Sequence, residues 1–263
     1  SNFVRVIDPP KTDANFESEK ERLGREVHDA FADLMAHNIQ PCALLLDTIF
    51  ASDGIYPAMK GILDDAVTAT HAAGALVIID EVQTGFARLG SDWWGFKSVG
   101  VEPDIVTMGK PMGNGYPIAG VVTKDELLQV FAEKGRYFNT FGGNPVAVAV
   151  GMAVLDELES QYLPQHVDDM GSYLENAFKE QLSSLGIAEI RGKGLYWGLE
   201  IAATSEETAD VRARRVVNRV RDAGVLLNYC GPKANVLKIR PPLTFQTEHA
   251  DCLVAALAEA LSY

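Results

Sequence analysis

Two residues that can do chemistry follow apolar runs typical of buried strands. Asp80 closes the run Ala75-Leu-Val-Ile-Ile, and Lys110 comes two residues after the run that starts at Asp104 and ends at Met108. In open α/β sheets, ligands bind outside the carboxyl ends of the strands, so both side chains are candidates for ligand binding. Taken singly, Asp80 could equally cap a turn, and Lys110 could be a solvated surface charge.

Three glycines, Gly109, Gly113 and Gly115, flank the lysine. Glycine lets the backbone approach a ligand closely or adopt a positive φ, although a Gly-Asn-Gly stretch is also an ordinary turn. An amine and a carboxylate at two neighbouring strand ends suit pyridoxal phosphate. The lysine amine forms a Schiff base with the aldehyde of that cofactor, and a carboxylate paired with the pyridine nitrogen keeps the ring protonated as an electron sink.

The residues around Asp80 and Lys110 belong to a longer pattern. It consists of Ile79-Asp-Glu-Val-Gln-Thr-Gly-Phe-Ala-Arg-Leu-Gly90, then Asp104-Ile-Val-Thr-Met-Gly-Lys110, and then Asn114-Gly115. In both segments and in their separation, the pattern resembles the class III (ornithine and 4-aminobutyrate type, fold type I) pyridoxal-phosphate-dependent aminotransferases. The resemblance implies that Lys110 forms the Schiff base and moves a proton between substrate and cofactor. It also implies that Asp80 binds the pyridine nitrogen and that Gln83 hydrogen-bonds the ring hydroxyl.

A further segment, Phe138-Asn-Thr-Phe-Gly-Gly-Asn-Pro145, fits the same family. The resemblance implies a homodimer with shared active sites, in which the Thr140 hydroxyl reaches the cofactor phosphate of the partner subunit. A hydroxyl and backbone N–H groups at a helix start suit a phosphate in their own right. The residues alone are equally compatible with a loop that only caps the helix.

Arg240 lies in the segment Lys238-Ile-Arg-Pro-Pro-Leu243. The resemblance implies that this arginine binds the substrate carboxylate, for which a planar guanidinium offers two parallel hydrogen bonds. The alternative is an arginine that closes an edge strand before the Pro-Pro break.

The segment Asp47-Thr-Ile-Phe-Ala-Ser-Asp-Gly54 departs from the family pattern. Many relatives have a glutamate that pairs with an active-site arginine at the position of Ser52. A serine cannot form that ion pair, although the neighbouring Asp53 could compensate. Glutamate and 2-oxoglutarate are therefore not assumed as the substrate pair.

The lysine loop is most similar to the branch that contains alanine–glyoxylate aminotransferases and aminoalcohol-phosphate phospho-lyases. Three functions stay open. The first is transfer of an amino group from an amino acid or amine to a 2-oxo acid through Lys110, and the second is elimination of phosphate from an aminoalcohol phosphate. The third is a non-catalytic domain of the same fold, because the resemblance covers only the later part of the cofactor domain and the C-terminal small domain.

The elements that must position these residues alternate between helix and strand. Apolar spacing predicts helices over residues 12–38, 58–73, 124–134, 144–159, 165–185, 205–223 and 247–261, and strands over 42–47, 75–80, 104–108, 117–123, 195–201, 224–228 and 236–240. This order predicts an α/β fold with a mainly parallel sheet. With the resemblance, it predicts a partial fold type I large domain over residues 1–160 and a small α+β domain over 161–263.

Composition limits the remaining classes of function. The 263 residues carry 23 Lys+Arg against 36 Asp+Glu, and the net charge of −13 disfavours a nucleic-acid or anionic-membrane partner. Three scattered cysteines, apolar runs too short to span a bilayer and an N-terminus unlike a signal peptide predict a cytoplasmic protein. The five histidines form no ligand pair, so no metal is expected.

Overall fold

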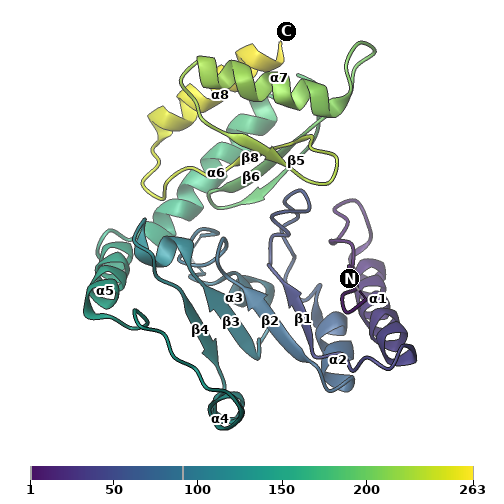
Figure 1. Cartoon of the computed structure of the whole chain (residues 1–263). Coiled ribbons are helices and arrows are strands. Elements are labelled where there is room, and N and C mark those ends of the chain that lie inside the picture. The colour runs from purple at the N-terminus through teal and green to yellow at the C-terminus, as the bar shows by residue number, and fades with distance from the viewer. Residues whose placement is uncertain (1, 91, 263) are drawn as a thin grey trace. The chain divides into compact units, whose positions relative to one another are not determined.

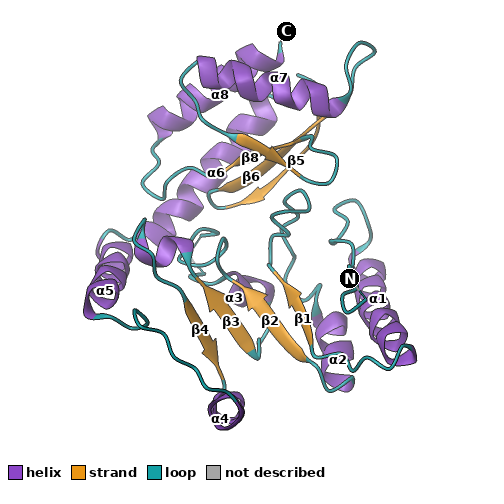
Figure 2. Ribbon diagram, viewed as in Figure 1, coloured by secondary structure: helices purple, strands orange, loops and turns teal. Residues whose placement is uncertain are grey.

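The computed structural model describes residues 2–90 and 92–262, which form two compact units (Figures 1 and 2). The first unit contains the described residues of Ser1–Thr48, Ala58–Phe86 and Trp94–Ser160. The second contains those of Ile49–Pro57, Ala87–Trp93 and Gln161–Tyr263. Each unit is built around its own four-stranded sheet. The assignment of residues 1–160 and 161–263 to a cofactor domain and a small domain stays a prediction.

The first unit combines its sheet with helices. Its elements are α1 (Phe16–Ala36), β1 (Ala43–Leu46), α2 (Asp64–Ala72), β2 (Leu76–Asp80), α3 (Gly95–Val99), β3 (Ile105–Met108), the 3₁₀ helix η1 (Lys110–Gly113), β4 (Gly120–Thr123), α4 (Asp125–Lys134) and α5 (Pro145–Ser160).

The strand order of this sheet is β1-β2-β3-β4. The pairs β1–β2 and β2–β3 are parallel, as expected for buried apolar runs, but β4 is antiparallel to β3. A parallel neighbour would need a crossover of a dozen or more residues, usually with a helix. Only a loop with the short η1 joins β3 to β4, so the chain returns antiparallel.

Helix α1 shows how local sequence fixes an element of this unit. The Asn15 side chain accepts hydrogen bonds from the backbone N–H groups of Glu17 and Ser18, which caps the helix. The apolar stripe of Leu23, Val27, Phe31 and Leu34 is buried. Gly24 packs against α2 so closely that a Cβ atom there would lie 2.6 Å from Cβ of Asp65.

The second unit has helices packed on an antiparallel sheet. Its elements are α6 (Leu163–Gln181), β5 (Ile187–Lys193), β6 (Tyr196–Ile201), α7 (Ala209–Asp222), β7 (Asn228–Cys230), β8 (Val236–Ile239) and α8 (Thr247–Leu261). The strand order is β5-β6-β8-β7, and all three pairs are antiparallel.

The two faces of this sheet are buried in different ways. Alternate residues of β6, namely Trp197, Leu199 and Ile201, join the main core with residues of α6, α7 and α8. Tyr196 points to the other face and packs with residues of 49–57 and with Leu89. The second unit thus recruits two short segments from earlier in the chain.

Two strands differ from the expectation. Strand β5 was not expected, because Glu189, Arg191 and Lys193 interrupt its apolar pattern. Arg191 is buried instead, with hydrogen bonds to the carbonyls of Gly54 and Ile55. The strand expected over 224–228 forms at Asn228–Cys230, where it pairs with β8, because residues 225–227 leave α7 as a loop.

The helical elements differ in smaller ways. Helix α2 begins at Asp64 rather than near 58, because turns with Gly61 at φ 83° precede it. Helix α3 was not expected. Within the described residues, no helix combines the length and apolar character needed to cross a bilayer.

Candidate active site

Asp80 is held firmly at the carboxyl end of β2. It lies opposite Thr107 in the parallel pairing of β2 with β3. One carboxylate oxygen, Oδ1, accepts hydrogen bonds from the backbone N–H of Val82 at 2.9 Å and from the Thr107 hydroxyl at 3.1 Å. These two contacts fix the orientation of the carboxylate, which is half-buried.

Lys110 begins η1, three residues after Thr107. Its φ is 37°, in the left-handed region that a residue with a side chain rarely adopts. Such strain is typical of functional positions that the surrounding fold constrains. Gly109, just before it, packs against Val82, because a Cβ atom there would lie 3.7 Å from both Val82 methyl groups. The loop with the lysine therefore lies next to the turn that follows Asp80.

These two strand ends offer the groups that pyridoxal phosphate requires. Among the residues that the structure describes, none hydrogen-bonds Oδ2 of Asp80, and none forms a hydrogen bond or ion pair with the exposed Lys110 amine. A carboxylate oxygen is thus available for a pyridine nitrogen and an amine for an aldehyde. The residues present fit this cofactor.

Gln83 and Glu81 belong to the turn after β2. Gln83 is half-buried, and its expected contact with the ring hydroxyl stays a prediction. Glu81 was not singled out from the sequence, yet it is buried and accepts hydrogen bonds from the Thr84 hydroxyl and from the N–H groups of Gly95 and Phe96. Burial raises the pKa of Glu81 despite these hydrogen bonds. Its carboxylate fixes the path of the chain between the turn and α3.

Thr140 lies in an exposed turn before α5. The Asn139 side chain shapes this turn by accepting hydrogen bonds from the N–H groups of Phe141 and Gly142. Asn144 caps α5 through the N–H of Ala147, as expected from the Asn-Pro pair. The Thr140 hydroxyl makes no hydrogen bond within the described part of the chain. Thr140 belongs to the first unit, which also contains Asp80 and Lys110.

Arg240 belongs to the second unit, where it directly follows β8 and is exposed. Its guanidinium carbon lies 6.0 Å from the centroid of the Tyr196 ring. Arg88 donates hydrogen bonds to the carbonyls of Leu195 and Pro241, and so it holds the backbone beside Arg240. Burial, together with the positive charge of Arg240, lowers the pKa of Arg88 to about 10. Sequence reasoning assigned Arg88 no role of its own.

The described residues include no group of three or more His, Cys, Asp or Glu side chains that could hold a metal ion.

Known proteins resemble this chain over most of its length. A family model described as aminotransferase class-III matches residues 2–261. The "Ethanolamine-phosphate phospho-lyase homolog 1" of Caenorhabditis elegans is 36% identical over 243 residues, which cover 90% of this chain and 52% of that protein. The "Alanine--glyoxylate aminotransferase 2 homolog 2, mitochondrial" of Arabidopsis thaliana is 35% identical over 264 residues, which cover 98% of this chain and 54% of that protein.

Solved structures show the same relationship. A phospholyase from Arthrobacter in complex with phosphoethanolamine has 38% sequence identity and a TM-score of 0.90, covering 98% of this chain and 62% of that one. A Bacillus anthracis aminotransferase has 29% identity and a TM-score of 0.81, covering 90% of this chain and 55% of that one. These matches confirm the predicted α/β fold and the predicted branch.

The chain spans about half the length of the curated relatives that it matches. The match of the family model nevertheless extends over nearly all of its residues, and the relatives are 35% and 36% identical to it. The chain therefore belongs to the class III aminotransferase family.

Proposed function

We propose that this chain carries the lysine and carboxylate of a class III aminotransferase active site. With pyridoxal phosphate as the cofactor, it takes part in transferring an amino group from an amino acid or amine to a 2-oxo acid. The observation that carries this proposal is the pairing of Asp80 with Thr107, because it sets a fixed carboxylate beside the strained loop of Lys110.

Each residue has a distinct task in this proposal. Bound pyridoxal phosphate supplies an electron sink that stabilises negative charge on the reacting carbon of the substrate. The Lys110 amine would take a proton from that carbon as a general base and then, as a general acid, deliver it to the C4′ carbon of the cofactor. The second carboxylate oxygen of Asp80, Oδ2, would accept a hydrogen bond from the protonated pyridine nitrogen and so keep the ring protonated. Val82 and Thr107 hold this carboxylate in its orientation through the other oxygen, Oδ1.

The other assigned residues bind and orient. Gln83 hydrogen-bonds the ring hydroxyl of the cofactor. Arg240 binds the carboxylate of the substrate through two parallel hydrogen bonds. The fixed backbone beside Arg240 supports this role, since Arg88 holds the Pro241 carbonyl.

A second candidate function is phosphate elimination from an aminoalcohol phosphate. It is favoured by the phospholyase from Arthrobacter, which has a TM-score of 0.90 to this chain and is in complex with phosphoethanolamine. The two functions differ in their products. Inorganic phosphate released from phosphoethanolamine supports the lyase, whereas a new amino acid formed from glyoxylate and an amino donor supports the transaminase.

Chemical trapping on the chain itself tests the lysine site that both candidate functions would use. The purified chain is incubated with pyridoxal phosphate and reduced with borohydride, and the modified lysine is located by peptide mass spectrometry. We expect one stoichiometric adduct at Lys110, which Lys110→Ala removes and the matched surface variant Lys233→Ala leaves unchanged. Absent or scattered labelling would instead support the alternative of a domain that is not catalytic by itself.

We also propose a homodimer with shared active sites, in which Thr140 contacts the cofactor phosphate of the partner subunit. The exposed Thr140 hydroxyl, which has no hydrogen bond within the described residues, supports this proposal. A light-scattering mass of a single copy would contradict it.

For the compartment, we propose the cytoplasm, because three free cysteines suit a reducing environment. The protein from Arabidopsis thaliana is called mitochondrial, so cell fractionation is the appropriate test.

A further inference from the structure

Arg88 connects the start of β6 to the end of β8 within the second unit. Its guanidinium donates hydrogen bonds to the carbonyl of Leu195, the residue before β6, and to the carbonyl of Pro241, two residues after β8. Continuing the antiparallel register of these strands places Tyr196 opposite Arg240. Arg88 therefore fixes the backbone next to both members of the Tyr196–Arg240 pair.

The ring of Tyr196 lies beside two cationic side chains. Tyr196 is fully buried, and its ring centroid is 6.0 Å from the guanidinium carbon of Arg240 and 5.4 Å from the amine of Lys238. Side chains two positions apart on a strand point to the same face, and aromatic faces attract cations at about this distance. The ring thus favours both cations on the same face of the sheet.

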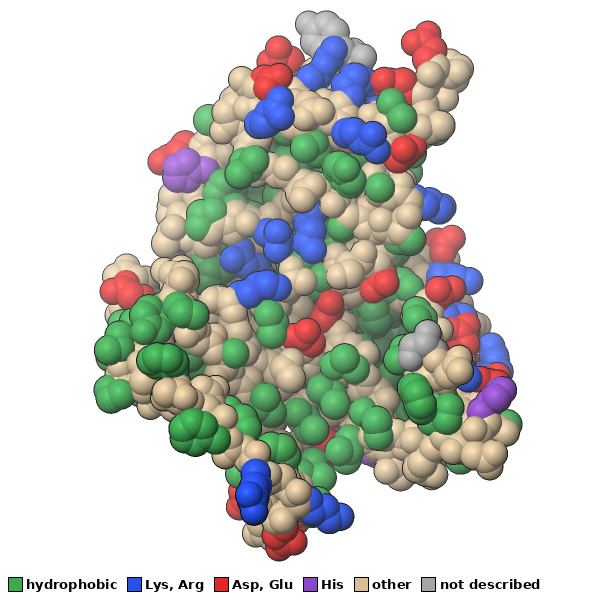
Figure 3. Space-filling view, in the orientation of Figure 1, with side chains coloured by type: hydrophobic (Ala, Val, Ile, Leu, Met, Phe, Trp, Pro, Cys, Tyr) green, Lys and Arg blue, Asp and Glu red, His purple; other side chains and the backbone are tan. Residues whose placement is uncertain are grey.

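Arg88 differs from other arginines of this unit in its partners. Among the described residues, no carboxylate pairs with Arg88, which hydrogen-bonds two backbone carbonyls instead. In α7, by contrast, Arg215 lies 2.8 Å from Glu207, and Arg221 lies 2.9 Å from Asp222. Figure 3 shows basic and acidic side chains gathered over that helix. The charge of Arg88 is therefore not neutralised by a neighbouring carboxylate.

The charges of Arg88 and Arg240 act on each other. Burial, and then the positive charge of Arg240, lowers the pKa of Arg88, so the two guanidinium groups are close enough to repel. An anion bound to Arg240 offsets this repulsion and is attracted by both groups. Because the Coulomb energy is proportional to the charge of the ligand, a dianion gains about twice as much from Arg88 as a monoanion does.

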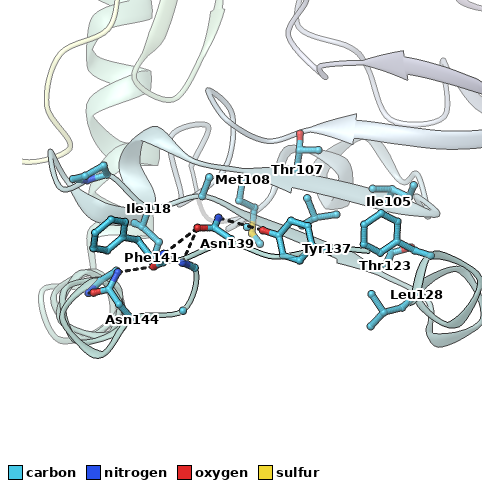
Figure 4. Close-up of a pocket in the computed structure, with 18 of the residues that line it drawn as sticks. Ile105, Thr107, Met108, Ile118, Thr123, Leu128, Tyr137, Asn139, Phe141 and Asn144 are labelled. Atoms are coloured by element: carbon cyan, nitrogen blue, oxygen red, sulfur yellow. Dashed lines mark hydrogen bonds between the residues drawn. The ribbon is translucent and has the colours of Figure 1, made fainter. Parts of the chain in front are cut away.

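A wide pocket in the first unit offers an anion no such charge (Figure 4). Its lining comes from β3, β4, α4 and the segment before α5, and no described Lys, Arg or His lines it. Two of its amide side chains are already engaged, since Asn139 donates to the Tyr137 hydroxyl and Asn144 donates to the Phe141 carbonyl. Of these two places, the arginine pair of the second unit is the one suited to an anion.

We propose that Arg88 is a positioning and specificity-determining residue, which fixes Arg240 through two carbonyls and, by its own charge, makes the site prefer a doubly charged anionic group over a carboxylate. This inference rests on the anion-binding role proposed for Arg240. A substrate that carries a phosphate monoester gains most from such a preference, because that group has a charge of about −1.5 to −2 at pH 7.

Anion binding by the full chain tests the proposal without a measurement of activity. NMR chemical-shift titrations at pH 8 give the dissociation constants of inorganic phosphate, which is mainly a dianion there, and of acetate, a monoanion. Low ionic strength keeps screening small. We expect phosphate to bind at least tenfold more tightly than acetate, at one site that Arg240→Met removes.

Substitutions separate the charge of Arg88 from its hydrogen bonds. Arg88→Met should weaken phosphate binding about tenfold and acetate binding about threefold, because the dianion loses twice the Coulomb energy. Arg88→Gln is also neutral but keeps an amide donor, so it replaces Arg88→Met if circular dichroism shows that the latter does not fold. Arg88→Lys keeps the charge, and the ratio of the two dissociation constants should stay within twofold of the original. Arg214→Met, at an exposed arginine 4.0 Å from Asp210, is the control and should change neither constant more than twofold.

Three results would overturn the proposal. The first is a lack of phosphate binding by the unsubstituted chain. The second is an equal loss of phosphate and acetate binding in the neutral variants, which would indicate a structural role alone. The third is a ratio that falls as far in Arg88→Lys as in Arg88→Met. Failure of the proposed function shows separately, as a missing borohydride adduct at Lys110, whatever the anion affinities are.

Discussion

Replacing Asp104 by asparagine should weaken the first unit, because this carboxylate joins three of its elements. Asp104 directly precedes β3 and is buried. It accepts hydrogen bonds from the backbone N–H of Val77 in β2 at 2.9 Å and from His71 of α2 at 2.9 Å. The amine of Lys124, just before α4, lies 3.0 Å from the other carboxylate oxygen.

The size of the effect follows from the pKa of Asp104. Burial opposes ionisation, but the hydrogen bonds from Val77, His71 and Lys124 outweigh it and lower the pKa from 3.8 to about 2. At about 1.4 kcal/mol per pKa unit, the ionised carboxylate contributes about 2 kcal/mol to the free energy of unfolding. A lowered carboxyl pKa gives stability that is present above the unfolded-state pKa and is lost as the pH falls through about 2.

Urea unfolding followed by circular dichroism measures this contribution. Asp104→Asn should lower the free energy of unfolding by about 2 kcal/mol at pH 7 and by about half of that at pH 3. Asp29→Asn, at an exposed position of α1, is the control and should change it by less than about 0.5 kcal/mol. A loss at pH 7 no larger than that of the control, or an equal loss at pH 3 and pH 7, would refute the reasoning.

Urea unfolding also checks three other changes. Gly24→Ala should destabilise the chain by about 1–3 kcal/mol, since the new Cβ atom would lie 2.6 Å from Cβ of Asp65; an unchanged midpoint would contradict the close packing of α1 and α2. Arg191→Met should cost about 3–5 kcal/mol, because it leaves Glu189 and two carbonyls without a buried partner; a loss below about 1 kcal/mol would mean that the guanidinium is dispensable. Lys110→Gly should be about 1 kcal/mol more stable than Lys110→Ala, because only glycine adopts φ 37° without strain; equal stabilities would mean that the backbone relaxes.

The sequence was sufficient where local pattern determines structure. Asp80 and Lys110 follow apolar runs that form β2 and β3, and both runs are short, continuous and bounded by turns. The apolar stripe of α1 could be predicted in the same way, because Leu23, Val27 and Phe31 recur at helical spacing. All three side chains are buried in the structure. The resemblance then gave these residues their roles, which physical pattern alone had left open.

The sequence was insufficient where distant residues determine structure. Strand β5 contains the charged residues Glu189 and Arg191, and it becomes a strand by pairing with β6 and by burying Arg191 against residues 54–55. A local signal for this hairpin existed in Gly194, whose φ of 55° suits a two-residue turn between the strands. Glu81 offered no such signal, because its partners Gly95 and Phe96 lie in a helix that was itself not expected.

The arrangement of the candidate site separates two requirements. Asp80 and Lys110, which both candidate reactions would use, lie at or just after the ends of the paired strands β2 and β3. Thr107 and Val82 orient the Asp80 carboxylate, and Val82 also packs against Gly109, the residue before Lys110. Arg240, assigned to the substrate, belongs to the other unit. It directly follows β8, which pairs with both β6 and β7, so it closes an inner strand of a different sheet and not the edge strand that was the alternative expectation. With the roles proposed above, substitutions around Arg240 would change which anionic group is bound and leave the proposed proton transfer at Lys110 in place. We propose this separation as the reason why one arrangement can serve both candidate reactions, transamination and phosphate elimination, since both begin with removal of a proton from the same substrate carbon.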